Sequence, residues 1–164
     1  MNINFRVDTL PVAQPRQRVA VRGEHAVQYT PTRHPVNGFK AAIQTAFAGT
    51  YDGPPCDGPV SIGMQFILPR PQSQIRKTKP NPRLWAAKKP DWDNLAKAVC
   101  DALNQIAYRD DKQIVEAVVR KQVAAGEERP HVLISIREIR TGVIDERDEV
   151  SQAALHTGAT DEPQ

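Results

Sequence analysis

The sequence predicts an α/β fold in which two helices pack on a small mixed or antiparallel sheet, in the order β-α-β-α-β-β. Two patterns support this prediction. Several segments alternate apolar and polar residues, as half-buried strands do, and two others place apolar residues at helical spacing. The chain has 164 residues, of which 40% are hydrophobic, and this is enough for one core. We therefore expect one folded domain over residues 1–140.

The N-terminal segment predicts a strand followed by a basic loop. Ile3, Phe5 and Val7 alternate with polar residues, so the first strand should end near Leu10. Residues 11–35 are rich in proline, arginine and glutamine, and they show no convincing periodicity. We expect this segment to be a long loop that carries positive charge.

Clear periodicity marks the next helix and strand. Apolar residues recur at helical spacing over 35–48, and Gly49 follows at the position where helices commonly end. Residues 60–68 alternate apolar side chains with smaller or polar ones, which predicts a second strand. The next segment, 70–89, contains seven basic residues, no acidic residue and several prolines, so we expect a second basic loop outside the core.

The C-terminal half predicts a second helix and two strands. Apolar residues fall on one helical face from about Asp93 to about Ala107. The runs 114–123 and 132–139 are typical of strands, and a glycine-containing turn between them predicts a β-hairpin.

Charge is distributed unevenly along the chain, whose formal net charge is +3. Residues 141–164 contain six acidic side chains and one basic side chain, a net charge of −5, so the rest of the chain carries +8. We expect this acidic tail to be disordered. A body this basic suits a polyanion such as nucleic acid, although an ordinary positive surface explains the charge equally well.

The location of the protein follows from what the sequence lacks. It contains no run of eighteen apolar residues and no signal-peptide pattern, so we expect a cytoplasmic protein without membrane association. Its two cysteines, Cys56 and Cys100, have neither metal-ligand nor disulfide-framework spacing, and we expect small core roles for both.

Two aspartates stand where the second helix should begin. Asp91 or Asp93 can cap backbone N–H groups and interact favourably with the helix dipole. Alternatively, two carboxylates spaced i and i+2 in an extended chain point the same way and can share a hard cation such as magnesium. Capping requires only one of the two aspartates.

A second acidic pair, Asp110 and Asp111, follows the predicted helix. Aspartate is common in turns, so these residues can belong to a simple connection. A helix of fourteen residues is roughly 21 Å long, which would separate this pair from Asp91 and Asp93. The two pairs meet only if the helix is shorter and the chain folds back along it, or in a composite arrangement.

Lys97 lies one turn into the predicted helix, four residues after Asp93. It can form an ordinary helical ion pair worth about 0.3–0.5 kcal/mol. Alternatively, its ammonium group can neutralise charge that develops on a phosphate during hydrolysis.

The run KPDWDNLAKAVCDALNQIAYRDDKQIVE resembles the core signature of the RusA-like Holliday junction resolvases. The resemblance rests on the D-x-D-N-L-x-K block, the D-A-L that follows and the D-D-x-Q-[IV]-V block, with weaker similarity over residues 3–139 that includes QPRQR and YTP. It implies a dimeric, magnesium-dependent α/β nuclease, in which manganese can replace magnesium, that nicks opposing strands of four-way DNA junctions in recombination and repair. It assigns the catalytic roles to Asp91, Asp93, Lys97 and Asp111, with the three aspartates as metal ligands. Asp110 remains a possible helper, and Glu116 is expected to be a strand-surface acid.

The two basic loops supply candidate phosphate contacts: Arg16, Arg18, Arg76, Lys77 and Lys79. The loop over 70–89 is longer than the shortest family members require, so junction preference follows less directly than nuclease chemistry. Two alternatives to a resolvase remain. One is a magnesium nuclease for flaps or other branched DNA, and the other is a noncatalytic DNA-binding protein.

Overall fold

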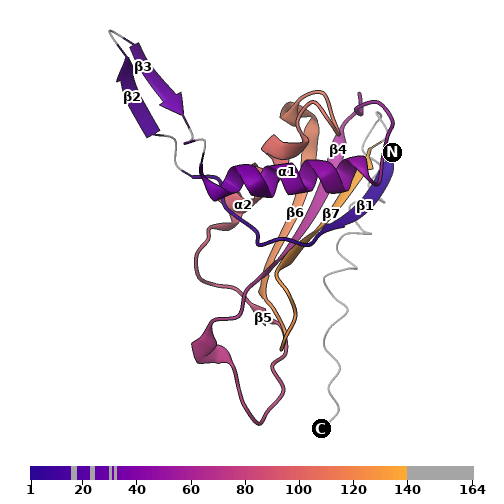
Figure 1. The fold of residues 1–164 in the computed structure, drawn as a ribbon. Coiled ribbons are helices and arrows are strands. Elements are labelled where there is room, and N and C mark those ends of the chain that lie inside the picture. Colours follow the sequence, from indigo (N-terminus) through magenta and orange to yellow (C-terminus); the bar gives the residue numbers. More distant parts are fainter. Residues whose placement is uncertain (16–17, 23–24, 30, 32, 140–164) are drawn as a thin grey trace.

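The computed structural model describes residues 1–15, 18–22, 25–29, 31 and 33–139, and the predicted acidic tail lies outside these ranges. A five-stranded mixed sheet has the strand order β1-β7-β4-β6-β5. Its strands are β1 (Asn2–Val7), β4 (Val60–Leu68), β5 (Leu84–Trp85), β6 (Ile114–Val123) and β7 (His131–Glu138). Helices α1 (Pro35–Ala48) and α2 (Trp92–Leu103) lie over the same face of this sheet (Figure 1). The predicted α/β class with two helices on a mixed sheet is confirmed.

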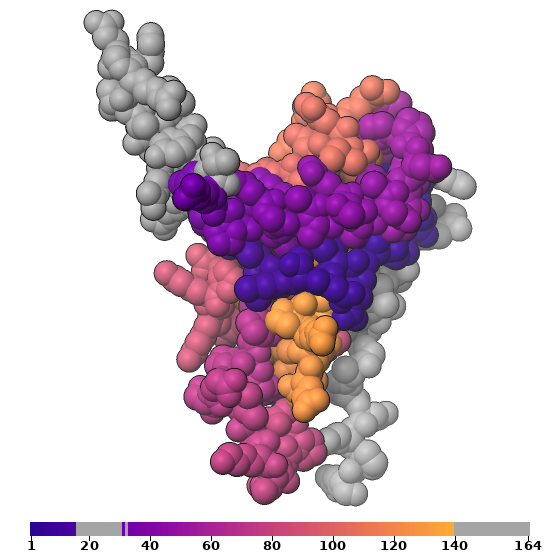
Figure 2. Space-filling view, in the orientation of Figure 1, coloured from indigo at the N-terminus to yellow at the C-terminus, as the bar shows by residue number. Residues whose placement is uncertain are grey.

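The helix-facing side of the sheet forms the core. Alternate residues of β1 and β4 are buried, as the period of two predicts. Helix α1 begins at Pro35, preceded by His34, whose Nδ1 accepts a hydrogen bond from the backbone N–H of Val36 at 3.1 Å. In the space-filling view α1 lies across β1, and the segment after β4 continues beyond the end of the sheet (Figure 2). In the described part of the chain, no helix has the length and apolarity needed to cross a membrane.

The predicted hairpin of the last two strands is wrong. Both strands form, but β4 lies between them, antiparallel to β7 and parallel to β6. Strand β4 is mostly buried on its helix-facing side and contributes Ile62, Met64 and Phe66 to the core, so it occupies a central position with neighbours on both sides. The crossover through α2 makes β4 and β6 parallel, and alternation within each strand carries no information about this pairing.

The predicted first loop also contains regular structure. Within 11–35 the backbone forms strands β2 (Arg18–Arg22) and β3 (His25–Tyr29), which pair as a separate two-stranded hairpin. This hairpin projects away from the main sheet (Figure 1). Short alternating sequences flank Gly23, and this local pattern indicates a hairpin. The high proline and arginine content of the segment obscured it.

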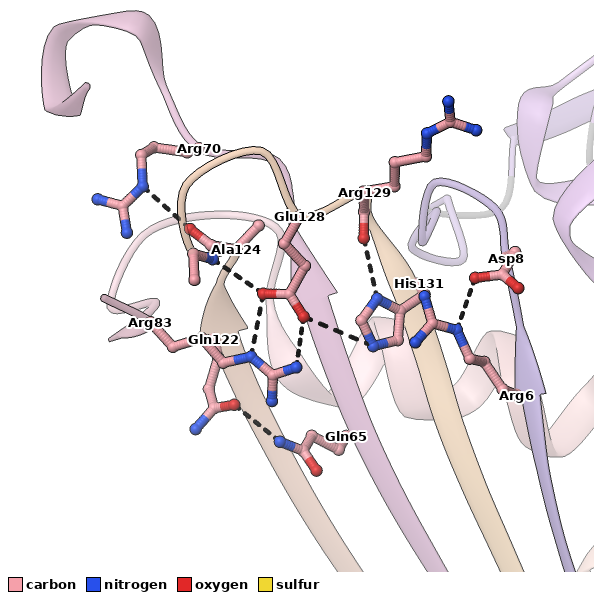
Figure 3. Close-up of polar contacts among 11 residues, drawn as sticks. Arg6, Asp8, Gln65, Arg70, Arg83, Gln122, Ala124, Glu128, Arg129 and His131 are labelled. Carbon is pink, nitrogen blue, oxygen red and sulfur yellow. Dashed lines mark hydrogen bonds and ion pairs between the residues drawn. The ribbon is translucent and has the colours of Figure 1, made fainter. Parts of the chain in front are cut away.

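The second basic loop lies outside the core, as predicted, but it is anchored at both ends. It contains a short 3₁₀ helix, η1 (Gln72–Gln74), and strand β5. The Arg70 guanidinium donates to the carbonyl of Ala124 at 2.9 Å, and the Arg83 guanidinium forms a two-pronged ion pair with Glu128 (Figure 3). Glu128 also accepts the backbone N–H of Ala125 at 2.9 Å. The β6–β7 connection therefore holds the loop in place.

Glu128→Gln is expected to destabilise the fold by about 1–2 kcal/mol at pH 7, because it removes a charged hydrogen-bond network. The Arg83 guanidinium, followed by the Ala125 N–H, lowers the pKa of Glu128 from 4.5 to about 2. A lowered carboxyl pKa stabilises the fold above pH 4.5, and this stabilisation fades as the pH falls through about 2. Urea unfolding at pH 7, 5 and 3 should show the difference between wild type and variant narrowing with acidity. The matched control is Glu127→Gln at an exposed neighbour, and an equal loss of stability in that control would contradict the assignment.

Candidate active site

Asp91 and Asp93 stand at the start of α2. Asp91 is the extended N-cap residue, with φ −70° and ψ 141°, yet its side chain makes no capping hydrogen bond. Asp93 is the second helical residue, so the alternative in which both aspartates lie in extended chain is not realised. Both side chains are exposed, and the Asn94 amide donates to Asp93 at 3.4 Å. The capping explanation is therefore not realised for Asp91, and its carboxylate faces solvent.

Helix α2 is shorter than predicted, because it ends at Leu103 rather than near Ala107. Asn104 is extended and Gln105 has a φ of 63°, so the chain turns sharply after the helix. The buried Tyr108 then donates its hydroxyl to the carbonyl of Cys100 at 2.9 Å. The chain thus folds back along α2, which is the arrangement that the two acidic pairs need in order to approach each other.

Asp110 and Asp111 have different environments in the chain that follows α2. Asp110 caps a short 3₁₀ helix, η2 (Asp111–Gln113), by accepting the backbone N–H of Lys112 at 3.0 Å. That hydrogen bond lowers the pKa of Asp110. The Gln113 side chain accepts the Asp110 N–H at 2.9 Å and donates to the carbonyls of Cys56 and Gly58, which fixes the turn. Asp110 therefore has a structural role, and Asp111 presents an exposed carboxylate.

Asp111 lies beside the C-terminal half of α2. Burial raises the pKa of Cys100 to about 11, and the carboxylates of Asp101 and Asp111 contribute to that rise. Asp93, Lys97 and Cys100 are spaced i, i+4 and i+7, so they occupy one face of the helix over roughly 10 Å. Asp93 therefore lies near the start of this face, and Cys100, which Asp111 approaches, lies near its end. Within the described ranges, no three acidic, histidine or cysteine side chains are grouped closely enough to hold one ion.

Lys97 is exposed on the same face. Among the ion pairs of the described residues, none joins Lys97 to Asp93, so the ordinary helical pair is not formed. Asp101, one turn further on, instead pairs with Lys40 of α1 at 2.9 Å and ties the two helices together. Glu116 lies on the sheet surface beside Ser61 and Arg137, as a strand-surface acid should.

Lys121 of β6 holds the segment that leads into Asp91, and the sequence pattern did not identify it. Its ammonium donates to the carbonyls of Lys88 at 2.7 Å and Pro90 at 2.6 Å. Its own carbonyl accepts the N–H of Ala86 at 3.0 Å. Both ends of the segment that leads into Asp91 are thus held by one strand residue. Only the tertiary structure reveals this contact, because Lys121 is an ordinary strand position in the sequence.

The predicted phosphate contacts divide into two sets. Arg76, Lys77 and Lys79 are exposed in the second loop. Asn81 closes that turn, since its side chain accepts the N–H of Arg76 at 2.9 Å and donates to its carbonyl at 3.0 Å. Arg16 lies outside the described residues. Arg18 begins β2, and its side chain also lies outside the described part of the structure.

Exposed aspartate oxygens are the ligands that hard cations such as magnesium prefer, so the donor chemistry of Asp91, Asp93 and Asp111 fits that ion. The two histidines whose side chains the structure describes, His34 and His131, offer no competing site. His34 accepts a bond at the start of α1, and the fully buried His131 pairs through Nδ1 with the carbonyl of Arg129 (Figure 3).

Comparison with known proteins identifies the family of this chain. Residues 8–137 match the family described as "Endodeoxyribonuclease RusA", whose nucleases are typically magnesium-dependent. The chain is also similar to "Uncharacterized protein YqaN" of Bacillus subtilis (strain 168). The two are 32% identical over 142 residues, which cover 84% of this chain and 96% of that protein. The chain therefore belongs to the RusA endodeoxyribonuclease family.

Proposed function

We propose that this protein is a magnesium-dependent endonuclease that resolves four-way DNA junctions by paired, symmetric nicks during recombination and repair. The observation that carries the proposal is the fold-back after α2, which returns Asp111 to the helix that bears Asp91, Asp93 and Lys97. Membership of the RusA family supplies the reaction class. The preference for four-way junctions follows from the sequence resemblance.

The proposed roles follow from the chemistry of each side chain. Asp91, Asp93 and Asp111 would hold the metal, which would have to draw their carboxylates together, because neighbouring carboxylates repel one another unless a cation compensates them. A bound magnesium ion would polarise the scissile phosphate and lower the pKa of a water molecule. The Lys97 ammonium neutralises charge that develops on the phosphate oxygens.

Lys121 orients Asp91 by holding the segment that precedes it. Lys121→Met is expected to slow cleavage by about 10- to 100-fold, since displacement of a ligand by about 1 Å has effects of that size. The conservative Lys121→Arg variant should recover part of the rate, because guanidinium N–H groups can reach the same carbonyls. Magnesium titration of the cleavage rate measures this, and the half-saturating concentration should rise in the methionine variant. An unchanged magnesium dependence with a uniformly lower melting temperature would assign Lys121 to stability alone.

The loop over 70–89 supplies the phosphate contacts. A combined Arg76→Ala, Lys77→Ala, Lys79→Ala variant is expected to flatten the log–log salt dependence of DNA binding by about three units, roughly one for each phosphate that is no longer neutralised. Arg6→Ala is the matched control, because its guanidinium pairs with Asp8 at the end of β1, away from the loop. Fluorescence anisotropy over a salt series measures both slopes. Equal slopes for wild type and the triple variant would show that these residues do not contact DNA.

Paired incision requires two active sites, so the proposal includes a homodimer whose two-fold axis matches that of the junction. A cruciform in supercoiled plasmid tests this. Both nicks within one binding event give mainly linear product, whereas independent nicks accumulate nicked circles. Persistent nicked circles, together with a monomer in sedimentation at micromolar concentration, would contradict paired resolution and leave the metal-nuclease chemistry standing.

A further inference from the structure

A hollow of about 350 Å³ is lined in part by the segment that leads into the proposed active site. Trp85 and Leu84 of β5 line one side, and the segment that ends at Pro90, immediately before Asp91, lines another. Leu10 and Pro11 from the chain after β1 complete an apolar wall. This volume falls in the range of pockets that accept small molecules.

Trp85 is unusually exposed for a tryptophan, at 71% of its surface. This exposed tryptophan does not lie at the tip of an unpaired loop. Trp85 is paired with Gln122 of β6, and the next residue, Ala86, donates to the carbonyl of Lys121 at 3.0 Å. Two residues before it, Arg83 is clamped to Glu128 (Figure 3). The indole is therefore presented by a backbone that is fixed on both sides, which keeps the entropic cost of binding small.

The chemistry of the rim identifies the kind of occupant. Lys88 and Lys89 line the hollow, both are exposed, and no acidic residue lines it. An apolar wall with an exposed indole and a positively charged rim suits a flat aromatic group attached to an anion. A nucleobase with its phosphate has this combination. A second copy of the chain would have to present negative charge to the two lysines.

We infer that this hollow, which we name the Trp85 pocket, binds an unstacked nucleobase at the branch point of DNA. The inference rests on the proposed function for its ligand, and it adds a site that favours branched over linear DNA. Bases in a continuous duplex are stacked and cannot enter the pocket, whereas a branch point interrupts stacking. Because Pro90 connects the pocket to Asp91, a base held against Trp85 places nearby phosphates beside the catalytic face of α2.

The test measures binding without cleavage, using the full chain in EDTA with a four-way junction and a linear duplex of matched sequence. Trp85→Ala is expected to weaken junction binding by about 5- to 100-fold, the range for removal of one aromatic ring on which a base stacks, and to change duplex binding less than twofold. Trp85→Phe should retain most of the affinity. Val118→Ala, which trims an exposed apolar residue on β6, is the matched control and should bind as wild type.

Fluorescence gives a second readout that a decrease in stability would not mimic. In a Trp92→Phe background Trp85 is the sole tryptophan, and its emission should be quenched by the junction but not by the duplex. Equal weakening on both DNAs, or absence of quenching, would overturn the inference. A shift of free Trp85→Ala protein towards monomer in sedimentation would also overturn it, because a second copy would then occupy the pocket. A protein that quenches without cleaving in magnesium would reject the proposed function alone.

Discussion

Asp93→Asn is expected to lower the rate of magnesium-dependent DNA cleavage by about 1,000-fold or more, while folding and junction binding persist. The physical reason is the loss of a charged oxygen ligand at an exposed position, whose only side-chain hydrogen bond among the described residues comes from Asn94 at 3.4 Å. Asparagine has almost the same shape, so the variant removes charge without disturbing α2. Single-turnover cleavage of a labelled junction measures the rate, and circular dichroism checks the fold.

The matched control for this variant is Asp8→Asn. Asp8 is also an exposed aspartate, but it pairs with Arg6 at the end of β1, on the sheet surface (Figure 3). Asp8→Asn should cut at the wild-type rate, whereas Asp91→Asn and Asp111→Asn should resemble Asp93→Asn. Near-normal cutting by purified Asp93→Asn protein would reject the assignment of this residue as a metal ligand.

Lys97→Ala is expected to lower the cleavage rate by about 100-fold, because the removed ammonium would neutralise charge in the transition state. Magnesium affinity should change little, since an ammonium group has no lone pair with which to ligate a cation. Magnesium titrations of the rate separate the two effects, and Lys97→Arg should restore part of the activity by returning the charge. A rise in the half-saturating magnesium concentration that matches the decrease in rate would instead place Lys97 among groups that organise the metal site.

The sequence predicted the fold where a single element determines the pattern. The range 35–48 matches α1, and 60–68 matches β4, because each buries one continuous face. Strand pairing was predicted less well, since β4 separates β6 from β7. The strand order depends on which strand is buried most completely. The alternation of apolar and polar residues within a strand does not show which strand it pairs with. The β2–β3 hairpin was missed because the proline and arginine content of the segment obscured two short alternating runs of five residues each.

The sequence likewise predicted part of the candidate site, and the rest depends on the tertiary structure. The spacing of Asp91, Asp93 and Lys97 is visible in the sequence, but the choice between Asp110 and Asp111 agrees with a capping bond that only the turn geometry reveals. Lys121 could not be identified, because its role consists of hydrogen bonds to carbonyls about thirty residues away. The end of α2 was placed too late because Ile106 and Ala107 continue the apolar pattern, although they belong to the returning chain.

The substrate of the site is tested most directly by single-turnover cleavage of three DNAs of matched sequence: a four-way junction, a flap and a linear duplex. In magnesium, wild-type protein should nick the junction symmetrically on opposing strands, cut the flap more slowly and leave the duplex intact, and Asp93→Asn should cut none of them. Faster cutting of the flap would make this chain a nuclease for other branched DNA. Binding to all three DNAs with no cleavage in magnesium or manganese would contradict the catalytic assignment altogether.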